Sequence, residues 1–390
     1  MNFKVAKSDL EAALEVVKGG LGSGADLESH VLFRVPLDGD GTRMEVLTHQ
    51  GRIFSSFPFV ATVEQNDDIK MFTVKESRLR MFLDTLPEDA VLVFECTDGK
   101  IVDVTGSDVT PSYQSLDPNQ FPFWDDLLAV AVKAGAKATL SAERLSKALG
   151  YSKLFASKNE SRKPELCVCE VKDGVLASTD TKAAALLKVP ALEKSTLRMH
   201  YKDSGGIQSF LANSKGDIEI LEYDRGVFFR RGDGAIFGEG RFLANFPTFS
   251  QPDPEDQSWW VIPVKDFLTG LKALRSSARE DDQSLTISRT DANGPVLISM
   301  LSTTGKTVSK EIPCTDHGCK AGGVPFTGEF DVEFDSIQEI LKAAGEVETI
   351  RFGVNQRKKG GYLRFIETPF KSDTDPGDEY LVVLRWTRAS

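Results

Sequence analysis

Three side chains in the last third of the chain have types and a spacing that could bind a metal ion. Cys314, His317 and Cys319 follow one another as C-x-x-H-x-C in a polar loop, and thiolate and imidazole are ligands that zinc prefers. The usual C-x-x-C pair is absent and no fourth ligand is evident. We therefore interpret the segment as an ordinary loop, and predict no metal and no cofactor.

Other groups capable of chemistry are scattered. No nucleophile elbow and no H-E-x-x-H motif occurs, and the glycines of residues 18–26 lack the Gly-Lys-Ser/Thr of a phosphate loop. Those glycines indicate a helix end followed by a flexible loop, and Cys167 and Cys169 are typical of strand residues facing one core. The four histidines stand in unrelated contexts, at His30, His49, His200 and His317. We predict that the chain is not an enzyme.

Basic side chains gather in short sets on segments with helical periodicity. Lys272, Arg275 and Arg279 lie at i, i+3 and i+7, away from the apolar positions of the same segment. A solvated helix face explains any one such set. The basic residues of these sets and their neighbours are Lys75, Arg78, Arg144, Lys147, Lys153, Lys158, Arg162, Lys163, Lys202, Lys272, Arg275 and Arg279.

Composition indicates an ordinary globular protein. The chain has 390 residues, of which 41% are hydrophobic and 27% charged, a length that suggests two or three domains. No apolar run reaches the ~18–20 residues of a membrane-spanning helix, and acidic residues interrupt the N-terminal apolar stretch, which excludes a signal peptide. Five cysteines, an odd number, fit a reducing compartment. We expect a cytoplasmic protein without membrane contact.

The charge is unevenly distributed. The net charge is −11 overall, with −11 in residues 1–126, +3 in residues 127–255 and −3 in residues 256–390. The predicted helices together carry +1, so the acidity lies on strands and loops. An acidic chain argues against general nucleic-acid binding, but near-neutral helices with scattered cations permit weak phosphate contacts.

A short strand that turns directly into a helix recurs along the chain. The apolar positions of the first copy are Phe3, Val5, Leu10, Ala13 and Leu14. The leucine-like position returns at residues 79, 145, 207, 267 and 337, at intervals of 60 to 70 residues, and the copy around 207 carries three extra residues between its halves. Such regular spacing is typical of duplicated units.

These copies predict three sections of α+β structure, each with two helices packed on antiparallel sheets. The predicted domains are residues 1–126, 127–255 and 256–390, and residues 127–137 are expected to be a linker. The predicted helices span residues 8–20, 75–86, 141–153, 201–213, 265–280 and 335–346.

The collinear order of these segments resembles the bacterial β sliding clamp of replicative DNA polymerase, along essentially the whole chain. The segments that carry the resemblance are FKVAKSDLEAAL, FTVKESRLRMFLDTLPED, LDPNQFPFW, ATLSAERLSKAL, ASTDTKAAA, GRFLANFPTF and EYLVVLRW.

The resemblance implies three tandem clamp-type domains and a closed head-to-tail homodimer whose helices line a hole for duplex DNA. On the helices of such a ring, the basic residues named above would be DNA-binding residues that contact phosphates. It also implies binding of a DNA polymerase, of a clamp loader, and of partner peptides in a cleft between domains 2 and 3. The location would be the nucleoid, or the host cytoplasm if a phage encodes the protein. The matching cleft positions are Leu166, Thr179, Lys182, Pro247, Phe249, Leu381, Val383 and Arg385.

The sequence also departs from the family. Gly22-Ser23-Gly24 stands where the family carries arginines, and Thr181-Lys182-Ala183-Ala184 replaces its Gly-His-Arg-Leu. One alternative is therefore a clamp-fold scaffold that no longer encircles DNA. Another is a nuclease with carboxylate-bound Mg²⁺, which would need a tight acidic cluster at strand ends that the sequence does not display.

Overall fold

The structure is a computed structural model of the chain. It describes residues 1–23, 27–36, 42–65, 69–161, 163–212, 214–242, 246, 258–279, 281, 283–291, 293–319, 326–344, 347–357, 360–367 and 377–388. The chain divides into two compact units. Met1–Ser146 and Lys194–Leu243 form the first unit, and Lys147–Glu193 and Ala244–Ser390 form the second.

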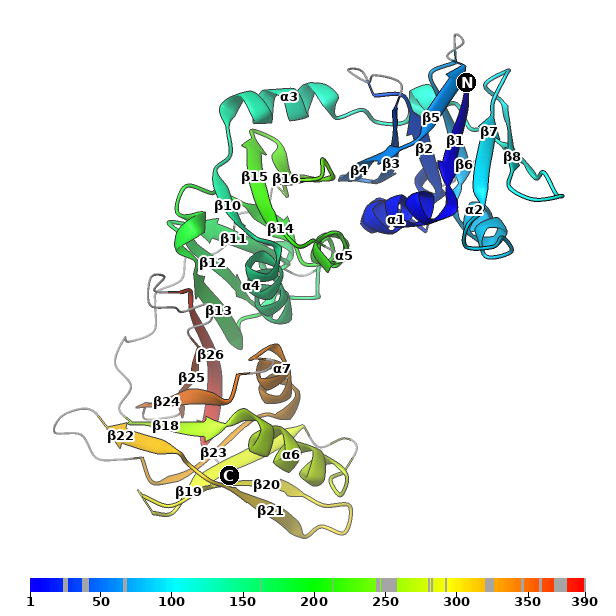
Figure 1. Ribbon diagram of the computed structural model, residues 1–390. Coiled ribbons are helices and arrows are strands. Elements are labelled where there is room, and N and C mark those ends of the chain that lie inside the picture. Colours follow the sequence, from blue (N-terminus) through cyan, green and yellow to red (C-terminus); the bar gives the residue numbers. More distant parts are fainter. Residues whose placement is uncertain are drawn as a thin grey trace. The chain divides into compact units, whose positions relative to one another are not determined.

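All six predicted strand–helix copies are confirmed (Figure 1). In the first copy β1 (Asn2–Ala6) passes directly into α1 (Lys7–Val17), which buries Leu10, Ala13 and Leu14 completely. The other copies are β6 (Met71–Lys75) with α2 (Glu76–Leu83), β10 (Ala138–Ser141) with α4 (Ala142–Phe155), β14 (Arg198–His200) with α5 (Ser204–Ala212), β18 (Ser258–Pro263) with α6 (Val264–Arg275), and β23 (Gly328–Glu333) with α7 (Phe334–Ala344). The extra residues predicted in the fourth copy form the turn between β14 and α5.

Two antiparallel sheets build the first unit. One has the order β5 (Thr62–Gln65), β1, β7 (Val91–Glu95), β8 (Ile101–Thr105) and β9 (Ser112–Gln114). The other has the order β10, β15 (Asp217–Tyr223), β16 (Gly226–Arg231), β17 (Ile236–Gly240), β4 (Ile53–Val60), β3 (Arg43–Gln50), β2 (His30–Arg34) and β6. Because β4 pairs with β17, the second sheet joins residues of the first and second predicted sections.

Phenylalanine rings fill the core between these elements. The rings of Phe3 and Phe94 stack with their centroids 4.7 Å apart, and Phe33 and Phe72 pack beside them. Together with the apolar faces of α1 and α2 they form one buried cluster. Burial of such large side chains gives the unit much of its stabilising free energy.

Helix α3 (Asp125–Ala134) is a feature that the sequence analysis missed, since we expected residues 127–137 to be a linker. Leu127, Leu128 and Ala131 pack against a small cluster on β15 and β16. Acidic residues begin the helix, where they complement its dipole, and Gly135 ends it with a φ of 81°. The helical period was hidden because almost every residue in the segment is apolar.

The second unit is a large antiparallel assembly with α6 and α7. Its main path runs β11 (Val168–Lys172), β12 (Val175–Thr179), β13 (Ala183–Lys188), β26 (Glu379–Arg388), β23, β19 (Ser284–Arg289), β20 (Val296–Leu301) and β21 (Thr307–Ile312). A branch continues from β26 through β25 (Gly360–Glu367), β24 (Thr349–Arg357) and β18 to β22 (Asp316–Cys319). Within the described residues, no helix is long and apolar enough to cross a membrane.

Candidate nucleic-acid and peptide interfaces

The basic side chains of α6 are only partly in the predicted arrangement. Lys272 is exposed on the helix, and the Arg275 guanidinium lies 5.4 Å from the centre of the Phe334 ring. The helix ends at Arg275, so the prediction that Arg279 continues the same stripe is wrong. The chain turns at Ser276, Ala278 forms a bridge with Ser302, and Arg279 lies 3.6 Å from Asp281. The face of α6 therefore presents Lys272 and Arg275.

On α2, Arg78 is exposed, while Lys75 is the half-buried last residue of β6. Arg80, a third cation on this helix, is paired with Glu76 and lies 3.5 Å from Glu15 of α1. Those two carboxylates offset its charge. Arg78 is therefore the residue of α2 that is best placed to reach a phosphate.

The cations around α4 differ in exposure. Arg144 and Lys147 are half-buried, whereas Lys153, Lys158, Lys163 and Lys202 are exposed, and Arg162 lies outside the described residues. Lys147 borders a groove of about 290 Å³ whose other lining residues include Tyr151 and Leu154 of α4 and Lys342 and Ala343 of α7. The groove also contains Glu339, which lies 3.2 Å from the Lys342 ammonium, so its rim carries charges of both signs.

The described peptide-cleft residues belong to the second unit, where Thr179, Leu381 and Val383 lie on strands, Leu166 ends a 3-10 helix and Lys182 lies in a turn. Leu166 and Thr179 are 4% exposed and Val383 is 6% exposed, whereas Leu381 is half-buried and Lys182 is exposed. The pairing of β13 with β26 places Leu186 opposite Leu381. Pro247 and Phe249 lie outside the described residues, and so does the side chain of Arg385, whose backbone belongs to β26.

The turn between β12 and β13 holds Lys182 in place. The Thr179 hydroxyl donates to the carbonyl oxygen of Ala183 at 2.7 Å, and Asp180 Oδ1 accepts from the backbone N–H groups of Lys182 and Ala183, each at 2.8 Å. Thr181 has a φ of 82°, so this turn is ordered by side-chain hydrogen bonds despite an unfavourable backbone conformation. The Lys182 ammonium lies 3.8 Å from a carboxylate oxygen of Glu333.

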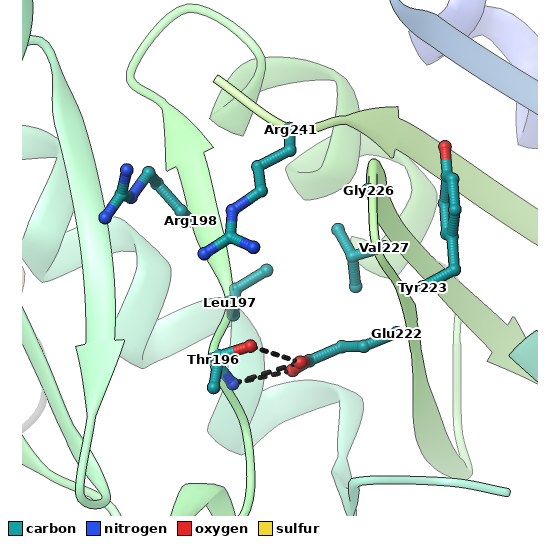
Figure 2. A pocket seen from close by; sticks show the side chains of 8 residues that line it. All are labelled: Thr196, Leu197, Arg198, Glu222, Tyr223, Gly226, Val227 and Arg241. Atoms are coloured by element: carbon teal, nitrogen blue, oxygen red, sulfur yellow. Dashed lines mark hydrogen bonds between the residues drawn. The ribbon is translucent and has the colours of Figure 1, made fainter. Parts of the chain in front are cut away.

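Figure 2 shows a small pocket in the first unit that the sequence analysis did not anticipate. Its space of about 20 Å³ suits roughly one water molecule. Glu222 accepts hydrogen bonds from the Ser195 hydroxyl and from both the N–H and the hydroxyl of Thr196, and burial raises the pKa of Tyr223 to about 12. These contacts fasten the turn before β14 to the β15–β16 hairpin.

The cysteines and histidine of the C-x-x-H-x-C segment have separate environments. His317 Nε2 lies 2.9 Å from Asn293 Oδ1, and burial raises the pKa of the Cys314 thiol. A raised thiol pKa disfavours the thiolate that binds metal. In the part of the chain that the structure describes, no three His, Cys, Asp or Glu residues could hold a metal ion together.

No family model matches the sequence, and no curated protein matches it either. Solved structures do match over the full length. The DNA polymerase sliding clamp from Bacillus subtilis has a TM-score of 0.80 at 14% identity, covering 100% of both chains. The DNA polymerase III β subunit from Thermotoga maritima has a TM-score of 0.77 at 15% identity with the same coverage.

A third match is the Pseudomonas aeruginosa sliding clamp bound to griselimycin, with a TM-score of 0.78 at 16% identity over 100% of both chains. The chain therefore has the fold of bacterial sliding clamps, as the order of its sequence segments led us to expect. The sequence has diverged far from each of these proteins.

Proposed function

We propose that this protein is a sliding clamp, which encircles duplex DNA as a homodimeric ring and tethers a DNA polymerase. The observation that carries the proposal is the agreement of fold over 100% of this chain and of solved clamps, with TM-scores of 0.77 to 0.80. The chain has all six strand–helix copies in order, and these supply the helices that would line such a ring.

The charges support this function. A ring must hold DNA without fixing it, and this favours few, exposed cations that contact phosphates without reading sequence. Arg78, Lys153 and Lys272 are exposed on their helices. Meanwhile the net charge of −11 discourages DNA from binding elsewhere on the protein.

Two strand edges support closure of the ring by a second copy of the chain. Strand β9 ends one sheet and β21 ends another, and an edge strand can pair with an edge of another molecule. The pairing would rest on backbone hydrogen bonds, because β21 carries both Lys310 and Glu311 and so has no net charge. Pairing of β9 with β21 of the partner would be heterologous, and two such contacts would close a ring.

Partner peptides, including those of a polymerase and a clamp loader, would dock along β13 and β26. Half-buried Leu381 offers an apolar contact, and exposed Lys182 offers a charge at the edge of the same surface. A groove of this kind binds a short peptide through a few buried anchors. Because Lys182 replaces a histidine of the family, an acidic residue in the peptide should be favoured.

The mass of the protein in solution and its retention on circular DNA test the proposal together. Light scattering should give about twice the 42.8 kDa of one chain. The protein, once loaded by its clamp loader onto a nicked circular plasmid, should remain bound through gel filtration and dissociate when a restriction enzyme linearises the plasmid. A monomer that is lost equally from circular and linear DNA would instead favour a scaffold that does not encircle DNA.

A further inference from the structure

Helix α3 packs on β15 and β16 through one of its sides (Figure 1). Ala131 is completely buried on that side, and Leu127 and Leu128 are half-buried beside it. On the other side Val130 is 61% exposed, and Ala129 is exposed next to it. A single exposed valine is ordinary on a protein surface, so the residues around it decide whether this side of α3 is an interaction surface.

Four exposed residues form the surface of α3 that is turned away from β15 and β16. Asp126, Ala129, Val130 and Lys133 are spaced i, i+3, i+4 and i+7, a spacing that places them along one face of an α-helix. We call this set the outer face of α3. It has a negative charge near its start, two apolar side chains in its middle and a positive charge near its end.

The two charges of the outer face do not pair with each other. Asp126 and Lys133 are about 10 Å apart along the helix axis, which is too far for an ion pair. Within the described part of the chain, neither side chain forms an ion pair with another residue, whereas the neighbouring Asp125 accepts a hydrogen bond of 2.6 Å from Arg34. The outer face therefore offers one acid and one base to another molecule.

The order of these residues is complementary to itself. Asp126 and Lys133 lie equally far in the sequence from the midpoint between Ala129 and Val130. If a second copy of α3 crosses antiparallel at that midpoint, each Asp126 faces Lys133 of the other copy, and each Ala129 faces Val130 of the other copy. A parallel pair would instead place like charges opposite each other. The small Ala129 side chain leaves room for Val130 at the usual distance of about 8–10 Å between packed helix axes.

We propose that the outer face of α3 binds the outer face of α3 on a second copy of the chain, as an antiparallel helix pair with two-fold symmetry. Two apolar contacts lie at the centre of the pair, and two Asp126–Lys133 ion pairs flank them. A phosphate or a partner with charge of one sign fits this face less well, because its acid and its base cancel.

This contact is separate from the one that would close a ring. The helix pair is isologous, since both copies use the same surface, whereas pairing of β9 with β21 is heterologous. The two contacts use different elements and can form together, so a homodimeric ring would carry two outer faces. Because α3 has 10 residues, the helix pair is small and belongs with weak, transient interfaces. It forms where the local concentration of the protein is high.

Sedimentation velocity of the full chain, at low salt and over a wide range of protein concentration, tests the proposal by charge reversal. The parent should form a larger species as its concentration rises, and added salt should reduce that association. Asp126→Lys makes both charges of the face positive, and Lys133→Asp makes both negative. Each variant alone should self-associate on the order of tenfold more weakly than the parent. An equal mixture of the two variants restores both ion pairs and should associate as the parent does.

Asp9→Lys is the matched control, because Asp9 is an exposed acid in the first turn of α1, and it should leave self-association unchanged. A mixture that associates no better than each variant alone would overturn the proposal. So would a parent without salt-sensitive association, or an Asp9→Lys protein that is weakened as much as Asp126→Lys. The ring contact at β9 and β21 should be the same in every α3 variant, so failure of the helix pair and failure of the ring are distinguishable.

Discussion

Gly19 and Gly206 lie backbone to backbone, although 187 positions separate them in the sequence. A Cβ atom added to Gly19 would lie 2.9 Å from both the Cα and the carbonyl carbon of Gly206. Gly19 belongs to a short 3-10 helix, η1 (Lys18–Gly20), that packs against α5. We expected these glycines at the end of the first helix, and η1 continues α1 there. Their further role, which the sequence did not indicate, is to permit close packing of two elements.

We expect Gly19→Ala to destabilise the first unit by about 1–3 kcal/mol, since neither backbone can move without disturbing its helix. Denaturant unfolding of the full chain measures the change. Gly216→Ala is the matched control, because a Cβ there meets nothing within 4 Å. That control should be neutral or slightly stabilising through the unfolded state. Equal effects of the two substitutions would contradict the close packing.

The strand–helix copies could be predicted from sequence because each buries a local stripe such as Leu10, Ala13 and Leu14, whose spacing is visible in the chain. Features that depend on distant partners could not. Leu127 and Ala131 are helical because β15 and β16 lie beneath them, and Gly19 is needed because Gly206 faces it. Arg279 left the predicted stripe because Ala278 pairs with Ser302, and no local periodicity records such a bridge.

Asp125 fixes the start of α3 and should give the first unit an acid-sensitive contact. Hydrogen bonds from Arg34, at 2.6 and 2.7 Å, lower the pKa of the Asp125 carboxyl group. The stabilisation is therefore present above the ordinary value and is lost as pH falls through the lowered pKa. Asp125→Asn should cost on the order of 1 kcal/mol at neutral pH, because the pair is partly exposed.

Unfolding curves measured from neutral to acid pH check this contact. The difference between the parent and Asp125→Asn should shrink as the pH falls. Asp126→Asn, at the exposed neighbouring position of the same helical turn, loses only an interaction with the helix dipole and should therefore change stability and its pH dependence less than Asp125→Asn does. A difference that stays constant with pH would mean that Asp125 acts through packing and not through its charge.

Lys272 and Arg279 should differ in their contribution to DNA binding, although we first expected both on one helix face. Lys272 is exposed on α6, whereas Arg279 lies beyond the helix end and close to Asp281. If α6 faces the duplex, Lys272→Glu should reduce the salt dependence of DNA binding by about one counterion per lost phosphate contact. Arg279→Glu should change it less.

For each variant, the affinity for circular DNA is measured at several salt concentrations. The salt dependence is the slope of the logarithm of the affinity against the logarithm of the salt concentration. Thermal unfolding of both variants should match the parent, since both side chains are exposed. If Lys272→Glu and Arg279→Glu reduce the salt dependence of binding equally, the DNA contacts extend past the end of α6. If neither variant reduces the salt dependence of binding, α6 does not contact DNA.

Leu381 is the residue that tests the peptide cleft most cleanly. Val383, its neighbour on the same strand face, is 6% exposed between β13 and β25, so a charge placed there would unfold the sheet before it reported on binding. Leu381 is half-buried and can lose its apolar contact at lower cost. Leu381→Ser should weaken binding of a clamp-binding polymerase peptide by tenfold or more, as loss of one buried anchor does, about 1–3 kcal/mol.

Fluorescence anisotropy of a labelled peptide measures that affinity, and light scattering confirms that the oligomer is unchanged. Val60→Ser is the control, because Val60 is an exposed aliphatic residue on β4 in the other unit. If both variants bind like the parent, peptides do not dock along β26. If Lys182→Glu also weakens binding of an acidic peptide, the turn after Thr179 supplies the charged edge of the same groove, because reversal of one exposed charge acts on the partner and not on the fold.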